Sequence, residues 1–182
     1  MKPDTIVITS KVDKSVFYRF SWFETMVRTK RYRSPAVFTT IMLIFSLICF
    51  SQVGRREQAG LLGGVLLGIG ILLPAIYFFN FFLSVREQAK KMGLERPKHV
   101  YTVSMTDAPD GIAIVTPTGK GGTLRVRWDQ IHAVYQAKDC IYFYVSDRQA
   151  FLLPKGQANV PDDKLIRFLV SQLPAEKLHG LS

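Results

Sequence analysis

Only one segment of the sequence has a composition that suggests phosphate chemistry. Gly119-Lys120-Gly121-Gly122 resembles a phosphate-binding loop, in which glycine N–H groups and a lysine side chain surround the phosphate. Such a loop also needs a preceding strand, a following helix, and a Ser or Thr directly after the lysine. Here Gly121 follows Lys120 and the strand–loop–helix context is missing, so we interpret the segment as a hairpin turn.

The remaining polar residues do not form the motifs of a metal site or of a catalytic nucleophile. The three histidines, His99, His132 and His179, are isolated, and no His or Cys stands at the spacing of zinc ligands. Cys49 and Cys140 form no pair motif, and no nucleophile motif or carboxylate pair is present. We therefore predict no catalytic residue, no cofactor and no metal site, which indicates a protein that is not an enzyme.

Two long uncharged segments dominate the first half of this 182-residue chain. Residues 35–53 and residues 60–85 contain no Asp, Glu, Lys or Arg, and only a short segment separates them. As helices they would be about 29 Å and about 39 Å long, against about 30 Å for the hydrocarbon core of a bilayer. We predict a transmembrane hairpin whose second helix tilts or kinks, with Pro74 as the expected kink. The alternative is a buried pair of core helices.

The basic residues of the chain lie next to these segments and predict its orientation. Residues 1–34 hold eight Lys and Arg against three acids, residues 86–98 hold five against two, and the intervening loop holds two against one. The positive-inside rule then predicts both termini in the cytoplasm and the short loop outside. We expect the protein to lie in a bacterial inner (plasma) membrane. We expect contacts with anionic lipid headgroups from Arg28, Lys30, Arg31, Arg33, Arg86, Lys90 and Lys91.

The net charge of +10 does not indicate nucleic-acid binding, because residues 99–182 are nearly neutral with nine basic and eight acidic residues. The second apolar segment also carries glycines four residues apart, Gly60, Gly64 and Gly68. Such a stripe allows close helix packing. Packing against the first helix of the same chain and packing against a second chain both remain open.

The remaining segments predict a small α+β domain. Residues 5–10 have the β-branched composition of a strand, and residues 13–28 form an amphipathic helix that lies either in the membrane interface or on the soluble domain. From residue 99 the apolar residues alternate between turns, which predicts an antiparallel meander closed by an amphipathic helix. The predicted organisation is an N-terminal strand and helix (1–34), the hairpin (35–85), a basic linker (86–98) and a β-domain with a C-terminal helix (99–182).

Three pieces of the second half, in this order, resemble the YcxB-like family of membrane proteins. They are residues 126–131 (Val-Arg-Trp-Asp-Gln-Ile), 139–146 (Asp-Cys-Ile-Tyr-Phe-Tyr-Val-Ser) and 150–155 (Ala-Phe-Leu-Leu-Pro-Lys). The resemblance implies two transmembrane helices and a pleckstrin-homology-like (PH-like) barrel capped by a C-terminal helix, with residues 5–10 adding a strand. It transfers no catalytic residue. The chain departs from the family at Ala158, where an aromatic residue is frequent.

Together these observations predict a non-enzymatic membrane protein whose cytoplasmic PH-like domain docks a protein partner of unknown identity. Two alternatives remain. The protein could be a membrane immunity or defence protein that neutralises a toxin by binding it, or a sensor of anionic lipids. A homo-oligomer formed through the second apolar segment is compatible with each of them.

Overall fold

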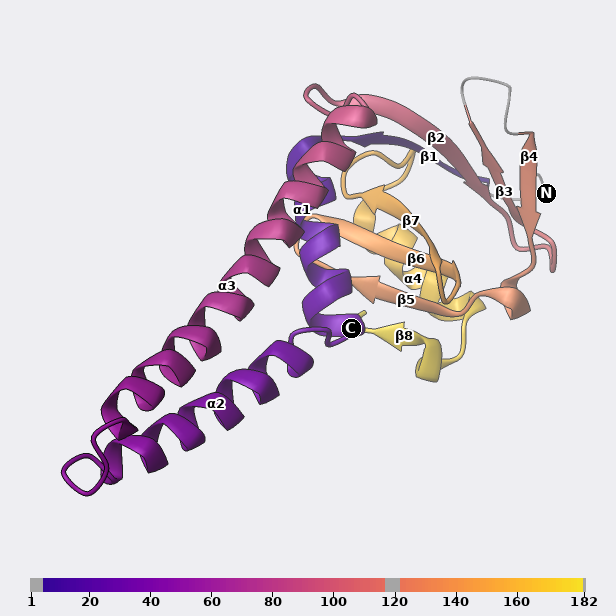
Figure 1. The fold of residues 1–182 in the computed structure, drawn as a ribbon. Helices are drawn as coiled ribbons and strands as arrows, with labels where there is room; N and C mark the ends of the chain where they lie inside the picture. The colour runs from indigo at the N-terminus through magenta and orange to yellow at the C-terminus, as the bar shows by residue number, and fades with distance from the viewer. Residues whose placement is uncertain (1–4, 117–121, 182) are drawn as a thin grey trace. The chain divides into compact units, whose positions relative to one another are not determined.

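The strand near the N-terminus pairs with a strand from the second half of the chain. In the computed structural model, which describes residues 5–116 and 122–181, β1 (Ile6–Val12) is antiparallel to β2 (Lys98–Met105), from Ile6 opposite Met105 to Val12 opposite Lys98. The sheet continues through β3 (Ile112–Val115) to β4 (Thr123–Val126), in the order β1-β2-β3-β4. The expected return of the N-terminal strand to this sheet is therefore confirmed (Figure 1). Residues 119–121 of the predicted turn lie outside the described residues.

A second sheet follows, in the order β7-β6-β5-β8. Its strands are β5 (Ala133–Gln136), β6 (Cys140–Ser146), β7 (Gln149–Pro154) and β8 (Leu178–His179). The first three form the predicted antiparallel meander, but β8 pairs with β5 in parallel. Because β8 occupies the free edge of β5, β4 cannot pair there. The described residues form two sheets instead of the expected closed barrel.

The core of this domain is covered by the predicted C-terminal helix, α4 (Asp162–Gln172). Asp162 and Asp163 occupy its first turn, where carboxylates suit the helix dipole. Leu165 and Leu169 are buried on its inner face. Trp128, in the 3₁₀ turn after β4, packs edge-on against rings from both sides of the core: Phe143 of β6 at 6.5 Å and Phe168 of α4 at 5.6 Å between ring centres.

The outer edge of β1 is covered by two side-chain amides. Gln157 accepts a hydrogen bond from the N–H of Lys11 over 2.6 Å and donates to its carbonyl over 3.1 Å. Asn159 accepts from the N–H of Val7 over 2.9 Å and donates to the carbonyl of Thr5 over 3.1 Å. Ala158 between them bridges Ile8. These contacts pair an edge that would otherwise be open to aggregation.

The second compact unit comprises residues 18–92, while residues 1–17 and 93–182 make up the first. The predicted amphipathic segment forms α1 (Lys14–Trp22) and a π-helical turn (Phe23–Arg28). Trp22 stacks on Phe82 with 6.0 Å between ring centres, so this end of the segment packs against the second long helix.

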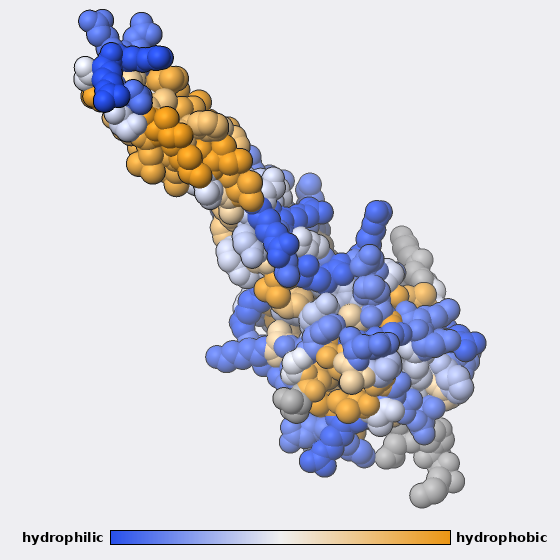
Figure 2. Space-filling model, turned by 90° about the horizontal axis from the view of Figure 1, so that it is seen from below, coloured by the Kyte–Doolittle hydropathy of each residue, from blue (hydrophilic) through white to orange (hydrophobic). Residues whose placement is uncertain are grey.

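Two helices in this unit are long and apolar enough to cross a membrane: α2 (Arg33–Ser51) and α3 (Ala59–Lys91). Only 6% and 11% of their most apolar windows are buried, which contradicts the alternative of a buried helix pair. Figure 2 shows their side chains as a continuous apolar surface with hydrophilic residues at its tip. The helix α3 extends six residues beyond the predicted end at 85, because residues 86–91 favour helix, and Gly93 (φ +68) follows its C-terminus.

Candidate functional site

The second long helix continues through Pro74 with help from the first. Proline has no N–H and cannot bond the carbonyl of Gly70 one turn earlier. Thr39 of α2 lies with its hydroxyl oxygen 3.1 Å from that carbonyl oxygen and 3.0 Å from the carbonyl oxygen of Pro35 in its own helix, so one proton is shared between them. An unpaired carbonyl is costly in lipid. Thr39 of α2 therefore supplies a hydrogen bond to the carbonyl of α3 that Pro74 cannot bond.

The two long helices pack closely against each other at two glycines seven residues apart. A Cβ atom at Gly70 would lie 2.7 Å from the Cβ of Met42, and one at Gly63 would lie 3.1 Å from the ring of Phe50. Ser46, which is buried, donates to the carbonyl of Gly63 over 2.8 Å. Glycine at these two positions lets the backbones meet.

The predicted glycine stripe occupies a different face of α3. A Cβ at Gly60 would lie 3.6 Å from Val53, an ordinary contact, whereas Gly64 and Gly68 have no atom within 4 Å of such a Cβ. Packing within the chain is thus found at Gly63 and Gly70 and does not involve Gly64 or Gly68. Successive residues of a helix are 100° apart, so a shift of one or two positions changes the face.

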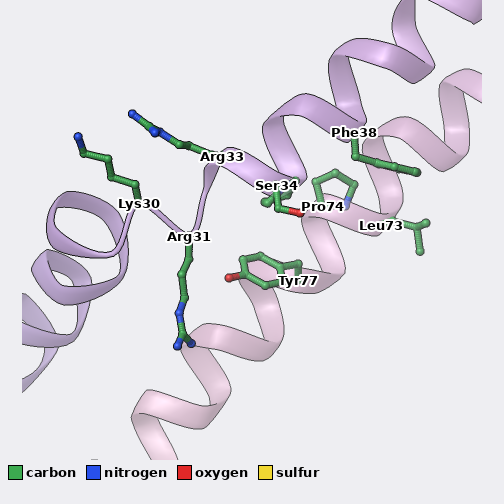
Figure 3. A pocket seen from close by; sticks show the side chains of 9 residues that line it. Lys30, Arg31, Arg33, Ser34, Phe38, Leu73, Pro74 and Tyr77 are labelled. Atoms are coloured by element: carbon green, nitrogen blue, oxygen red, sulfur yellow. The ribbon is translucent and has the colours of Figure 1, made fainter. Parts of the chain in front are cut away.

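These contacts fix the register of the two helices, that is, which residues of α2 and α3 lie side by side along the hairpin. A groove between the helices is lined by Arg33 and Ser34 at the start of α2 and by Pro74 and Tyr77 of α3 (Figure 3). The 19 residues of α2 cover about 29 Å, close to one hydrocarbon core. The part of α3 after Tyr77 is about 21 Å long and extends beyond the start of α2. The groove therefore lies where the paired part of the hairpin ends.

Three basic residues line this groove: Lys30 and Arg31 in the loop before α2, and Arg33 at the first position of α2. The loop begins where the π-helical turn ends: Lys30 adopts a left-handed conformation (φ 49), and the N–H of Arg31 bonds the carbonyl of Thr25 over 3.0 Å. Phe38 and Leu73 supply apolar walls deeper in the groove. The complete lining is Lys30, Arg31, Arg33, Ser34, Pro35, Phe38, Leu73, Pro74 and Tyr77.

The structure divides the basic residues predicted for membrane contact into three sets. Lys30, Arg31 and Arg33 line the groove. Arg28 forms an ion pair with Glu24 over 2.9 Å. The remaining residues are exposed near the C-terminal end of α3: Arg86, Lys90 and Lys91. Sequence reasoning did not place Ser34, Phe38 or Tyr77 in a site. The enrichment of tyrosine at membrane interfaces is the sequence signal that could have identified Tyr77.

A second polar cluster is buried in the β-domain. The hydroxyl of Tyr101 on β2 donates to the carbonyl of Leu152 on β7 over 3.0 Å and accepts from the N–H of the same residue. Ser10 on β1 donates to the same carbonyl over 2.6 Å. Burial raises the pKa of the Tyr101 hydroxyl, so it stays protonated well into the alkaline range. These bonds join the two sheets where no ladder connects them.

Cys140 is not available for covalent chemistry. Its side chain is 2% exposed, and burial raises the pKa of the thiol from 9.0 to about 12. The nucleophilic form of cysteine is the thiolate, which is absent at neutral pH. Among residues 5–116 and 122–181, no three His, Cys, Asp or Glu side chains are grouped to hold a metal ion.

Comparison with known proteins identifies one family. Residues 108–164 match the model of the family described as YcxB-like protein. The matched segment runs from before β3 into α4 and contains all three pieces on which the resemblance was based, so that prediction is confirmed. Neither the curated proteins nor the solved structures contain a match to the chain.

Proposed function

We propose that this chain, with its YcxB-like segment, is a bacterial inner-membrane protein that presents a cytoplasmic PH-like docking domain. The exposed apolar surfaces of α2 and α3 support a membrane anchor. The two sheets do not close into the barrel that the family resemblance implies, but the C-terminal helix covers their core as the resemblance implies, and this cap supports the PH-like assignment.

The pairing of β1 with β2 carries the proposed topology. The hairpin lies between these strands in the sequence, and their ends at Val12 and Lys98 are direct partners in the sheet. Both connections to the hairpin therefore leave the β-domain from one end of a strand pair, so both ends of the hairpin lie on one side of the membrane. The basic residues around both connections favour the cytoplasmic side.

Protease protection tests this orientation. In right-side-out vesicles, added trypsin should leave the β-domain intact, because the domain faces the lumen, whereas inverted vesicles should expose it. An antibody against residues 170–181 detects the fragment, and detergent-opened vesicles serve as the control for cleavability. Cleavage after Lys164 or Arg167 in intact right-side-out vesicles would contradict the proposal.

The open edge of the first sheet is the docking surface that we propose. The strand β4 is last in the sheet order, so its outer edge has no partner strand among the described residues. Two apolar side chains beside this edge are exposed, Val115 at 43% and Leu124 at 40%. An extended partner segment could add to such an edge, with main-chain hydrogen bonds supplying affinity.

Photo-crosslinking in living cells tests this docking surface. A photoreactive amino acid at position 124 should form an adduct with a partner protein. The same amino acid at Val170 of α4, which is 46% exposed, is the matched control and should form none. Equal adducts at both positions, or none at position 124, would show that the β4 edge is not a specific docking site.

A second copy of the chain is a further proposed partner. A Cβ atom at Gly64 or Gly68 of α3 would meet no atom of the described chain within 4 Å. These glycines would permit close approach of a helix from another molecule. This supports a homo-oligomer formed through the second span, with both glycines in the contact.

A further inference from the structure

We propose that the groove between α2 and α3 binds one anionic phospholipid of the cytoplasmic leaflet, with its phosphate at the basic loop and an acyl chain against the apolar wall. The proposal rests on the membrane anchor and orientation given above. It goes beyond a general attraction to the bilayer, because it assigns a defined site to a single lipid molecule.

The charge of the groove favours an anion. Lys30, Arg31 and Arg33 are exposed and form no ion pair in the part of the chain that the structure describes. The nearest acidic residue in sequence, Glu24, is held by Arg28 over 2.9 Å. Three cations that lack a carboxylate partner leave a site for a phosphate, which arginine binds with paired hydrogen bonds.

The side chains divide the groove into a polar and an apolar part. Figure 3 shows Arg31 extending beside α3, past the hydroxyl of Tyr77, while Lys30 in the loop and Arg33 at the start of α2 extend in another direction. Ser34 places a second hydroxyl at the start of α2. A phosphate near Arg31 would therefore have hydroxyl donors from both helices, with two further cations at the mouth.

The apolar part distinguishes a lipid from a soluble phosphate compound. Phe38 lies one turn further into the hairpin than Ser34, and Leu73 lies one turn further in than Tyr77. Leu73 is 51% exposed, so its surface is open to an occupant. Because the groove lies at the end of the paired helices, this wall coincides with the first methylene groups of the leaflet. A soluble phosphate compound would leave it uncovered.

A defined site differs from general electrostatic attraction in how strongly the lipid affinity depends on which cation is removed. Attraction to an anionic surface is worth about fivefold in affinity for each nearby cation, whichever residue carries it. A bound phosphate instead makes the effect of each cation depend on its distance from the groove. Lys90, exposed at the other end of the basic region, carries the same charge as Arg31 but does not line the groove.

The experiment measures lipid binding to the full-length protein in neutral detergent by native mass spectrometry. Phosphatidylglycerol is titrated, with phosphatidylcholine as the uncharged reference. We expect one tightly retained phosphatidylglycerol and an affinity about tenfold lower for Arg31→Gln. The matched control Lys90→Gln should change the affinity by less than about twofold, because Lys90 is exposed and does not line the groove. Equal losses for both variants would overturn the proposal in favour of general attraction.

Two further arms test the apolar wall and the source of the phosphate. Phe38→Ala keeps all charges and should still lower phosphatidylglycerol affinity by about fivefold, because it removes apolar contact area; an unchanged affinity would overturn the assigned wall. Glycerol 3-phosphate should not displace the lipid. Displacement at equal concentration would identify a soluble ligand and overturn the lipid assignment. Binding in detergent does not depend on orientation, so a failed protease-protection experiment would overturn only the leaflet assigned to the lipid, whereas a failed binding experiment would overturn the site itself.

Discussion

Replacing Tyr101 with phenylalanine should lower the free energy of unfolding of the β-domain by about 2 kcal/mol. The ring and its edge-on contact with Phe151 at 5.1 Å remain, so the change removes only the hydroxyl. The N–H of Leu152 loses the partner that the structure gives it, and an unsatisfied buried donor is costly. Urea titration followed by the fluorescence of Trp128 measures the loss.

Two companion variants make this prediction specific. Ser10→Ala should cost less, about 1 kcal/mol, because Tyr101 still donates to the Leu152 carbonyl. The double variant should cost more than the sum of the single changes, because the carbonyl then loses both donors. Tyr32→Phe, at a side chain that is 41% exposed, is the control and should have no effect. Additive losses would show that the two hydroxyls do not act on a common partner.

The raised pKa of Tyr101 adds a dependence on pH. A group whose pKa is higher in the folded state than its ordinary value of 10.0 stabilises the fold fully below that value. This contribution decreases as the pH rises above 10, because the unfolded chain then releases a proton that the folded chain retains. In the Tyr101→Phe variant the free energy of unfolding should lack this part of its decrease at alkaline pH. The same pH profile of unfolding free energy in the variant and the unmodified protein would contradict a raised pKa at Tyr101.

Replacing Gly70 with leucine should disrupt the hairpin, at a cost of about 3 kcal/mol. The first added carbon would lie 2.7 Å from the Cβ of Met42, so the helices must separate. Separation also removes the bond from Thr39 to the carbonyl that Pro74 leaves unpaired. Thermal loss of helical circular dichroism of the full chain in detergent should begin at a lower temperature than in the unmodified protein.

Gly68→Leu is the matched control on the same helix. It introduces the same side chain where a Cβ meets nothing within 4 Å, so the hairpin should keep its stability. Comparable losses of hairpin stability for the two variants would contradict the assigned contact face.

Combined with Gly64→Leu, the Gly68→Leu substitution tests self-association. Crosslinking of the paired variant in native membranes should yield less dimer, and an unchanged yield would rule out a homo-oligomer through these glycines.

The groove was predicted only in part. The basic residues 28–33 were identified from their charge and their place before an apolar segment, which are properties of the sequence alone. Tyr77 and Leu73 became part of the site because the contacts at Gly63 and Gly70 fix how far along α3 the start of α2 lies. A sequence specifies the length of each helix but not the register between two of them.

Local pattern by itself determined the apolar helices, the alternating strands and the closing helix of this protein, because helix length, side-chain period and turn residues act over a few neighbouring positions. Tertiary structure alone decided the pairing of β5 with β8 that prevents a barrel and the bonds from Tyr101 and Ser10 that join the sheets. It also decided which face of α3 meets α2. These contacts join residues far apart in the sequence, and each partner acquires its role only when the folded chain brings the other to it.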